Sequence, residues 1–222
     1  MKINLKGKNA LITGSSKGIG FDIAKTLQDN GCKIVINGKN QSKLNIAKKR
    51  LHNCIAIRGD VSKYNEANMI IKKFNKYFEK LDILVCNVGS GKAKKKIPDI
   101  KEWHQSFDIN FWSTINIINS AKKILIKSNS SIICISSICG LEYVKGAPIH
   151  YSVAKSALNS FVLNQSKFFG NFKVRINAIA PGNIMFNGST WSKKMKKSPY
   201  NTKKYINENV ALKILGKTSD IS

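Results

Sequence analysis

Short apolar runs alternate along this chain with longer segments of helical periodicity. An apolar run of about four to eight residues is typical of a strand buried on both faces. The predicted strands cover residues 9–13, 33–37, 54–58, 81–86, 130–136 and 172–179. The predicted helices cover about 19–30, 42–51, 63–79, 99–127 and 148–169. This alternation predicts an α/β fold with a doubly wound parallel sheet, for which we expect the strand order 3-2-1-4-5-6.

No linker and no internal repeat divides the chain, so residues 1–222 are predicted to form a single domain. The segment 183–209 has a different character, because it is polar and rich in lysine and contains Gly188, Trp191 and Pro199. We expect this segment to fold into short helices that act as a lid over a substrate site.

A glycine-rich turn follows the first predicted strand. The sequence Thr13-Gly14-Ser15-Ser16-Lys17-Gly18-Ile19-Gly20 leads directly from that strand into a helix. Glycines in such a turn allow positive φ angles and a close approach of the backbone to a phosphate group. The free N–H groups and the dipole of the new helix favour a pyrophosphate at this point.

Tyr151 and Lys155 form a second candidate site. They lie four residues apart in a predicted helix, so they share one face. A neighbouring cation lowers the pKa of a phenol from its usual value near 10, which would allow proton transfer at neutral pH. The same spacing also occurs on ordinary solvated helices, so the pair alone does not establish a site.

An ordered series of motifs over residues 9 to 184 resembles the short-chain dehydrogenase/reductase family, in particular its 3-oxoacyl-acyl-carrier-protein reductase-like members. The motifs are Thr13-Gly14, Gly18-Ile19-Gly20, Asp60-Val61, Asn87-Val88-Gly89, Asn110, Ser136-Ser137, Tyr151 with Lys155, and Pro181-Gly182. The resemblance implies a Rossmann fold and hydride transfer with a nicotinamide cofactor. It also implies a further helix and a seventh strand beyond residue 222, so the C-terminus looks truncated.

The resemblance assigns four catalytic residues. Tyr151 would be the acid and base, and Lys155 would lower its pKa and hold the nicotinamide ribose. Ser137, with Ser136 as the neighbouring candidate, would donate a hydrogen bond to the substrate oxygen. Asn110 would hold a water of a proton relay, or else is an ordinary exposed asparagine.

The end of the second predicted strand bears on the cofactor. No acid follows it, and by resemblance Lys39 takes the place of an arginine that reads the 2′-phosphate of NADP. This pattern favours NADP(H) over NAD(H), unless Lys39 is simply a surface lysine. The expected cofactor-binding residues are Gly14, Ser16, Lys17, Gly18, Ile19, Gly20, Lys39, Asp60, Val61, Asn87, Gly89, Tyr151, Lys155, Pro181, Gly182 and Ile184.

The formal net charge of +26 raises the question of nucleic acid as a partner. Only three of the 38 basic residues are arginines, and the lysines are scattered, so a compositional bias is the better explanation and nucleic acid is an unlikely partner. Two lysine clusters, at 92–96 and at 193–197, fall in loops that the family places near the substrate mouth. They would steer an anionic substrate or an acidic carrier protein, or they are solvated charge runs.

Metal and membrane partners are not expected. The histidines and the five cysteines lack the spacing of metal ligands, and no apolar run reaches the length of a membrane span. The chain begins with a strand and no signal peptide, which predicts a cytoplasmic protein.

The sequence therefore predicts an oxidoreductase that transfers hydride between NADP(H) and a carbonyl or secondary alcohol. A 3-oxoacyl thioester, free or bound to a carrier protein, is the first substrate hypothesis. A dehydrogenase of a sugar, polyol or other small alcohol, and a non-catalytic dinucleotide-binding protein, remain alternatives. A homo-oligomer, dimer or tetramer, is expected from the resemblance.

Overall fold

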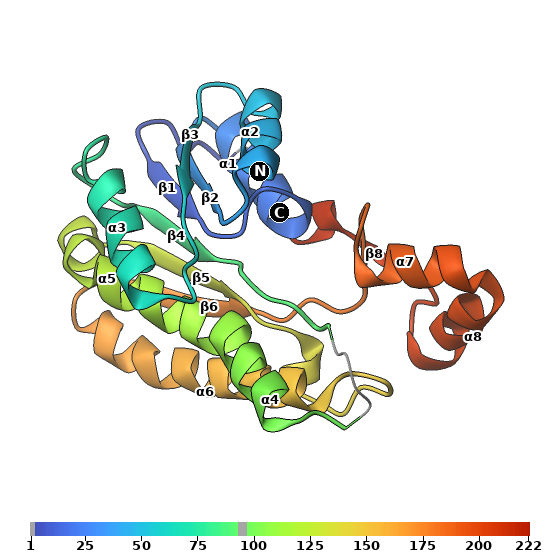
Figure 1. The fold of residues 1–222 in the computed structure, drawn as a ribbon. Coiled ribbons are helices and arrows are strands. Elements are labelled where there is room, and N and C mark those ends of the chain that lie inside the picture. The colour runs from blue at the N-terminus through green and yellow to red at the C-terminus, as the bar shows by residue number, and fades with distance from the viewer. Residues whose placement is uncertain (1–2, 93–96) are drawn as a thin grey trace.

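The computed structural model describes residues 3–92 and 97–222. Its centre is a six-stranded parallel sheet in the order β3-β2-β1-β4-β5-β6 (Figure 1), which confirms the predicted topology. The strands are β1 (Asn9–Ile12), β2 (Lys33–Gly38), β3 (Ile55–Arg58), β4 (Ile83–Cys86), β5 (Ser131–Ile135) and β6 (Arg175–Ile179). Among the described residues, no strand pairs with β6 on its outer side.

Side chains that alternate along the strands fill two separate cores. Leu11 of β1 lies in one core, whereas its neighbours Ala10 and Ile12 lie in the other. Because both faces are covered, the strands are apolar throughout, as parallel strands usually are.

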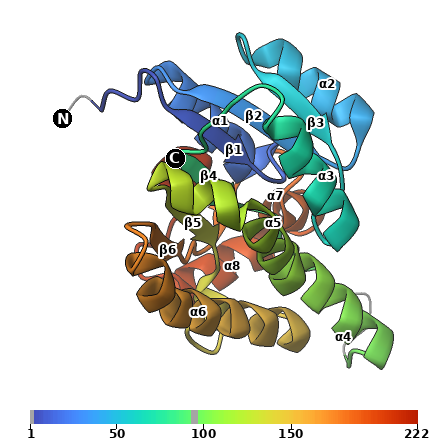
Figure 2. The same cartoon turned by 90° about the vertical axis from the view of Figure 1, so that its left-hand side faces the viewer.

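The helices cover the two faces as a doubly wound fold requires. Those of the main body are α1 (Gly18–Asp29), α2 (Gln41–Arg50), α3 (Tyr64–Phe74), α4 (Ile100–Phe107), α5 (Ser113–Ser128) and α6 (Ile149–Gly170). Helices α1 and α2 pack on one face and α3, α5 and α6 on the other (Figures 1 and 2). All six strands then point their carboxyl ends towards one edge, where ligands of such sheets bind.

The single helix predicted over residues 99–127 is interrupted. A π-helical turn (Asp108–Trp112) separates α4 from α5, and Asn110 lies in that turn. Hydrophobic periodicity does not reveal a one-residue insertion in a helix, so the sequence pattern could not predict the turn. Such insertions are frequent at functional sites.

The segment predicted as a lid forms β7 (Ile184–Met185), α7 (Thr190–Lys197) and α8 (Pro199–Asn209). Strand β7 pairs with β8 (Gly216–Lys217), outside the main sheet. In Figure 1 the two helices project from the carboxyl edge of the sheet. The 3-10 turn at Thr218–Asp220 packs against α1, and Ile221 joins the core beside that helix. No helix among the described residues combines the length and the apolar character needed to cross a bilayer.

Candidate functional site

The glycine-rich turn lies between β1 and α1 and is shaped to receive a phosphate group. Gly14 and Gly18 have φ angles of +62° and +60°, which residues with a Cβ atom rarely adopt. Helix α1 begins without a side-chain cap, so its first N–H groups are left for a ligand. The residues present therefore fit the pyrophosphate of a dinucleotide.

Asn87 holds this turn against the end of β4. Its amide Nδ2 donates to the carbonyl oxygens of Thr13 (3.0 Å) and Gly14 (3.1 Å), and its backbone N–H donates to Thr13 Oγ1 (3.0 Å). A Cβ atom on Gly20 would collide with the Asn87 amide. The predicted motifs around Gly14, Gly20 and Asn87 therefore form one packed unit.

An aromatic ring lies beside the turn. A Cβ atom on Gly18 would come within 2.6 Å of Phe186 Cε2, so the ring packs directly against this glycine. The sequence alone could not show that the Phe186 ring would lie against this turn.

Lys39 and Asp60 meet at the ends of β2 and β3. Lys39 Nζ lies 3.5 Å from Asp60 Oδ2, and the lysine side chain is 71% exposed. Asp60 Oδ1 accepts hydrogen bonds from the backbone N–H (3.1 Å) and the hydroxyl (2.8 Å) of Ser62. Burial raises the pKa of Asp60, but the bonds from Ser62 and the charge of Lys39 outweigh it and lower that pKa. The structure thus brings together two residues that the sequence analysis named separately as cofactor-binding residues.

Lys17 belongs to a group of cations beside the turn. Burial lowers its pKa, and repulsion from Lys43, Lys92 and Lys193 lowers it further. The last two residues come from distant segments, so the carboxyl edge of the sheet gathers positive charge around the phosphate position.

Tyr151 lies at the start of α6 and Ser137 follows the end of β5, close enough to Tyr151 to affect its pKa. The pKa of Tyr151 is raised, because burial outweighs the lowering effect of its hydrogen bond with Ser137. Ser137 also accepts a hydrogen bond from the backbone N–H of Cys139 (3.2 Å). Ser136, the neighbouring candidate, has a buried hydroxyl without a hydrogen-bond partner among the described residues.

Lys155 is buried behind Tyr151. Its Nζ donates to the carbonyl oxygen of Ile135 at 2.8 Å, and only 2% of the residue is exposed. Burial lowers the pKa of Lys155 to about 8. Gly89 leaves room for the amine, because a Cβ atom there would lie 3.1 Å from Nζ.

The predicted effect of Lys155 on the pKa of Tyr151 is wrong for this structure. The amine lies 6.0 Å from the centroid of the phenol ring and is bonded to Ile135. The pKa of Tyr151 rises because the cost of burying a phenolate is the largest contribution. Spacing in the sequence placed both residues on one face but could not show how deeply each is buried.

Asn110 is fully buried, so the interpretation as an exposed asparagine is wrong. Its Oδ1 accepts from the backbone N–H of Ser90 (2.8 Å), and its Nδ2 donates to the carbonyl oxygens of Ser90 (3.1 Å) and Ser106 (3.0 Å). Asn110 therefore fixes the loop after β4, next to Gly89 and the Lys155 amine.

The remaining predicted residues lie around this centre in different ways. The carbonyl oxygen of Pro181 accepts from the backbone N–H of Ile138 (3.1 Å), which places Pro181 and Gly182 beside the Ser137 loop. Ile184 is part of β7. Val61 is instead a core residue, 1% exposed, and Ile19 packs against the core beside α1. Ser16 lies next to Gly38 at the end of β2.

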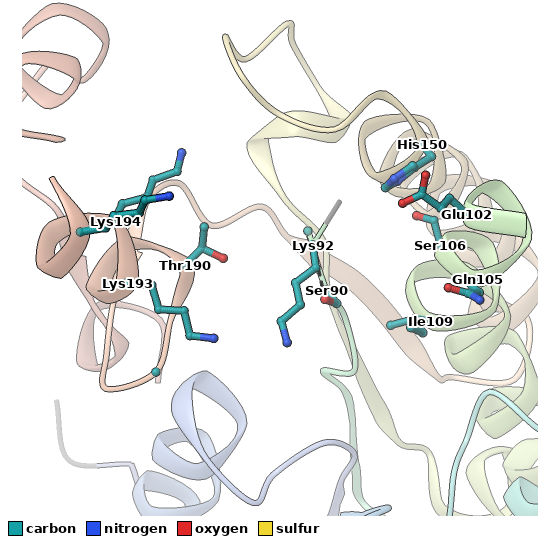
Figure 3. Close-up of a pocket in the computed structure, with 13 residues that line it drawn as sticks. Ser90, Lys92, Glu102, Gln105, Ser106, Ile109, His150, Thr190, Lys193 and Lys194 are labelled. Carbon is teal, nitrogen blue, oxygen red and sulfur yellow. Dashed lines mark hydrogen bonds between the residues drawn. The ribbon is translucent and has the colours of Figure 1, made fainter. Parts of the chain in front are cut away.

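A cavity of about 610 Å3 opens between the loop after β4 and helix α7, and Tyr151 is adjacent to it without being one of its lining residues. Gly91 lines it and packs against the tyrosine ring, since a Cβ atom on Gly91 would lie 3.6 Å from Tyr151 Cε1. The other lining residues are Ser90, Lys92, Glu102, Gln105, Ser106, Ile109, His150, Gly188, Thr190, Lys193, Lys194 and Lys197 (Figure 3). Its size suits a small molecule.

Sequence reasoning missed His150 as a cavity residue. It is 3% exposed, its ring packs edge-on against Trp103, and its Nδ1 has no hydrogen-bond partner among the described residues. Its position directly before Tyr151 was the available signal. The lysines at 193, 194, 196 and 197 lie on helix α7 and not in a loop, and Lys94, Lys95 and Lys96 lie outside the described residues.

No group of three or more potential metal ligands occurs within residues 3–92 and 97–222.

Comparison with known proteins identifies one family over most of this chain. A family model described as short chain dehydrogenase matches residues 8–197. An uncharacterized oxidoreductase of Staphylococcus saprophyticus is 32% identical over 207 residues, covering 89% of this chain and 88% of the relative. A trihydroxynaphthalene reductase of Pestalotiopsis fici is 33% identical over 191 residues, covering 82% and 66%. The active-site complex of Pseudomonas aeruginosa RhlG with NADP has a TM-score of 0.89 at 25% identity, covering 99% of this chain and 88% of that one.

Proposed function

Because the chain belongs to the short-chain dehydrogenase/reductase family and is an oxidoreductase using a nicotinamide dinucleotide, we propose that it reduces a small carbonyl compound with NADP(H). The observation that carries the proposal is the position of Tyr151. Its ring packs against Gly91, which lines the cavity, Ser137 is close enough to lower its pKa, and Lys155 is buried nearby.

The bound cofactor would supply the hydride, and the chain would supply the proton and the orientation. A raised pKa keeps Tyr151 protonated at neutral pH, so it is ready to donate to a carbonyl oxygen. Ser137 would donate a second hydrogen bond to that oxygen, and this bond strengthens as negative charge develops there. Tyr151 is therefore in the protonated form that reduction of a carbonyl requires.

The preference for NADP(H) rests on charge at the end of β2. Gly38 stands where an acid would bind the ribose hydroxyls, and Lys39 and Lys17 are the nearby cations. The 2′-phosphate would compete with Asp60 for Lys39, which is exposed enough to turn towards it. The structural neighbour RhlG was solved with NADP.

A 3-oxoacyl thioester remains our first substrate hypothesis, and catalysis by a homo-oligomer is the proposed form. An apolar hollow on the outside of α4 supports the second point, because it exposes Ile100 and Trp112 at 67% and 46%. Exposed apolar surface of this kind is typical of an interface.

The direct test is the oxidation of NADPH across a panel of carbonyl compounds that includes acyl thioesters. Tyr151→Phe removes the proton donor, so turnover should fall at least about a thousandfold while the affinity for NADPH changes less than about twofold. Tyr143→Phe is the matched control, because Tyr143 is 90% exposed and should keep full activity. Residual turnover of the Tyr151 variant above a few per cent would refute the proposed role.

A further inference from the structure

The cavity beside Tyr151 has one wall that is almost entirely cationic. Thr190, Lys193, Lys194 and Lys197 line it from α7 and follow the spacing i, i+3, i+4, i+7, which places them on one helix face. A lid helix would ordinarily turn an apolar face towards an apolar substrate. Helix α7 instead directs lysine side chains towards the cavity (Figure 3).

These lysines repel one another. Like charges at i and i+4, as in Lys193 and Lys197, destabilise a helix by a few tenths of a kcal/mol. Lys92 enters the same cavity from the loop after β4. Within the part of the chain that the structure describes, Lys92, Lys193 and Lys197 have no carboxylate at ion-pair distance. Lys194 lies over the rings of Trp191 (4.7 Å) and Tyr205 (5.7 Å).

Repulsion also extends from the cavity to the glycine-rich turn. Lys92 and Lys193 both lower the pKa of Lys17, which shows that the cavity lysines lie near the phosphate position. A cofactor phosphate would compensate Lys17. The lysines of α7 point into the cavity on the other side of Gly188, where a second anion would be needed to offset them.

The opposite wall is polar and buried. His150 is 97% buried, since 3% of it is exposed, and its Nδ1 lacks a partner among the described residues. Figure 3 places His150 beside Glu102 and Ser106, across the cavity from Lys193 and Lys194. A buried polar atom without a partner costs about 1–3 kcal/mol, so a ligand with a polar group would be favoured here.

We propose that the substrate is an oxo compound with an anionic group, which the lysines of α7 and Lys92 bind while His150 contacts its polar part near the carbonyl. This inference rests on the proposed reductase function and names its substrate class. A carboxylate and a phosphate would satisfy the same lysines. A small anion is favoured over an acidic carrier protein because Lys193 and Lys197 line the cavity itself.

Pairs of substrates that share the same oxo group, one anionic and one neutral, test the inference. The pairs are a 3-oxo acid with its methyl ester, a phosphorylated ketone with its dephosphorylated form, and acetoacetyl-coenzyme A with its neutral N-acetylcysteamine thioester. In at least one pair, the KM of the anionic member should be lower than that of the neutral member by about tenfold or more. The pair with the largest ratio of these two KM values identifies whether the lysines prefer a carboxylate or a phosphate.

The Lys193→Gln, Lys197→Gln double variant should raise the KM of the anionic member about tenfold, leave kcat within twofold and leave the neutral member unchanged. The control is Lys196→Gln combined with Lys203→Gln, which removes the same charge from exposed positions off the cavity wall. An equal effect of the control would show a general field and overturn the inference.

Other outcomes are equally decisive. Equal KM values for both members of every pair would overturn the anionic class while the reductase function stands. An effect of the double variant that is confined to a protein-bound thioester would favour carrier docking instead. If no carbonyl in any pair is reduced, the proposed function itself fails.

Discussion

The buried amine of Lys155 makes a quantitative prediction about stability. Its pKa is about 8 in the folded protein against 10.5 for a free lysine, so the unfolded chain binds more protons between these two values. Stability rises with pH wherever the unfolded state binds more protons. The cost of burying this amine is therefore fully present below about pH 8 and disappears as the pH rises towards 10.5.

The magnitude follows from the shift of 2.5 units, since 10.5 minus 8 is 2.5. At about 1.4 kcal/mol for each unit, the burial costs about 3 kcal/mol at pH 7, of which about 2 to 3 kcal/mol should be regained by pH 10. Lys155→Met keeps most of the apolar stem and removes the titrating group. It also removes the hydrogen bond to the Ile135 carbonyl. That loss changes the free energy of unfolding by an amount that depends little on pH.

Urea unfolding of the cofactor-free protein at pH 7, 8.5 and 10 measures the effect. The free energy of unfolding of the wild type minus that of Lys155→Met should increase by about 2 to 3 kcal/mol from pH 7 to pH 10. Tyrosines and cysteines titrate in both proteins and cancel in the difference. Lys203→Met, at an exposed position, should show no such increase. A constant difference across this range for Lys155→Met would refute the reasoning.

Three further predictions test other parts of the site. Asn110→Ala leaves the N–H and carbonyl of Ser90 without partners, so the free energy of unfolding should fall by about 3 kcal/mol and Tm by about 6–12 °C. A variant that melts within about 2 °C of the wild type, followed by circular dichroism, would contradict this prediction. Lys39→Asp should lower the NADPH to NADH ratio of kcat/KM at least about tenfold, and an unchanged ratio would remove the argument for NADP(H). Phe186→Thr uncovers Gly18 and adds a hydroxyl, so calorimetry should show about fivefold tighter cofactor binding; weaker binding would show that the ring supports the site.

Features that depend on period and order could be predicted from the sequence. The apolar strands and the helices between them gave the strand order, because a parallel sheet with right-handed crossovers admits few alternatives. The glycine-rich turn was equally accessible, since Gly14 and Gly18 do adopt positive φ angles. The structure also places Ser137 and Lys155 near Tyr151, but their catalytic roles remain predictions.

Features that depend on depth and on side-chain direction could not be predicted. The helix pattern around Asn110 gave no sign of the π-helical turn or of complete burial. His150 was dismissed because its sequence neighbours show no ligand spacing, whereas its importance comes from the packing of α4 against α6. The sequence left open whether the lysines of α7 steer an anionic ligand or form a solvated charge run, and the cavity shows which of them share its wall.

The positions of Lys155 and Tyr151 bear on how the phenol could transfer a proton. In the structure Lys155 is bonded to the Ile135 carbonyl, and Tyr151 has a raised pKa, so neither yet has the arrangement expected for base catalysis. Gly89 preserves this arrangement, because a Cβ atom there would lie 3.1 Å from the Lys155 amine and 3.2 Å from Asn110 Oδ1, so a side chain would displace both groups. Burial, which the sequence could not reveal, thus keeps Tyr151 protonated and able to donate to a carbonyl oxygen when one binds.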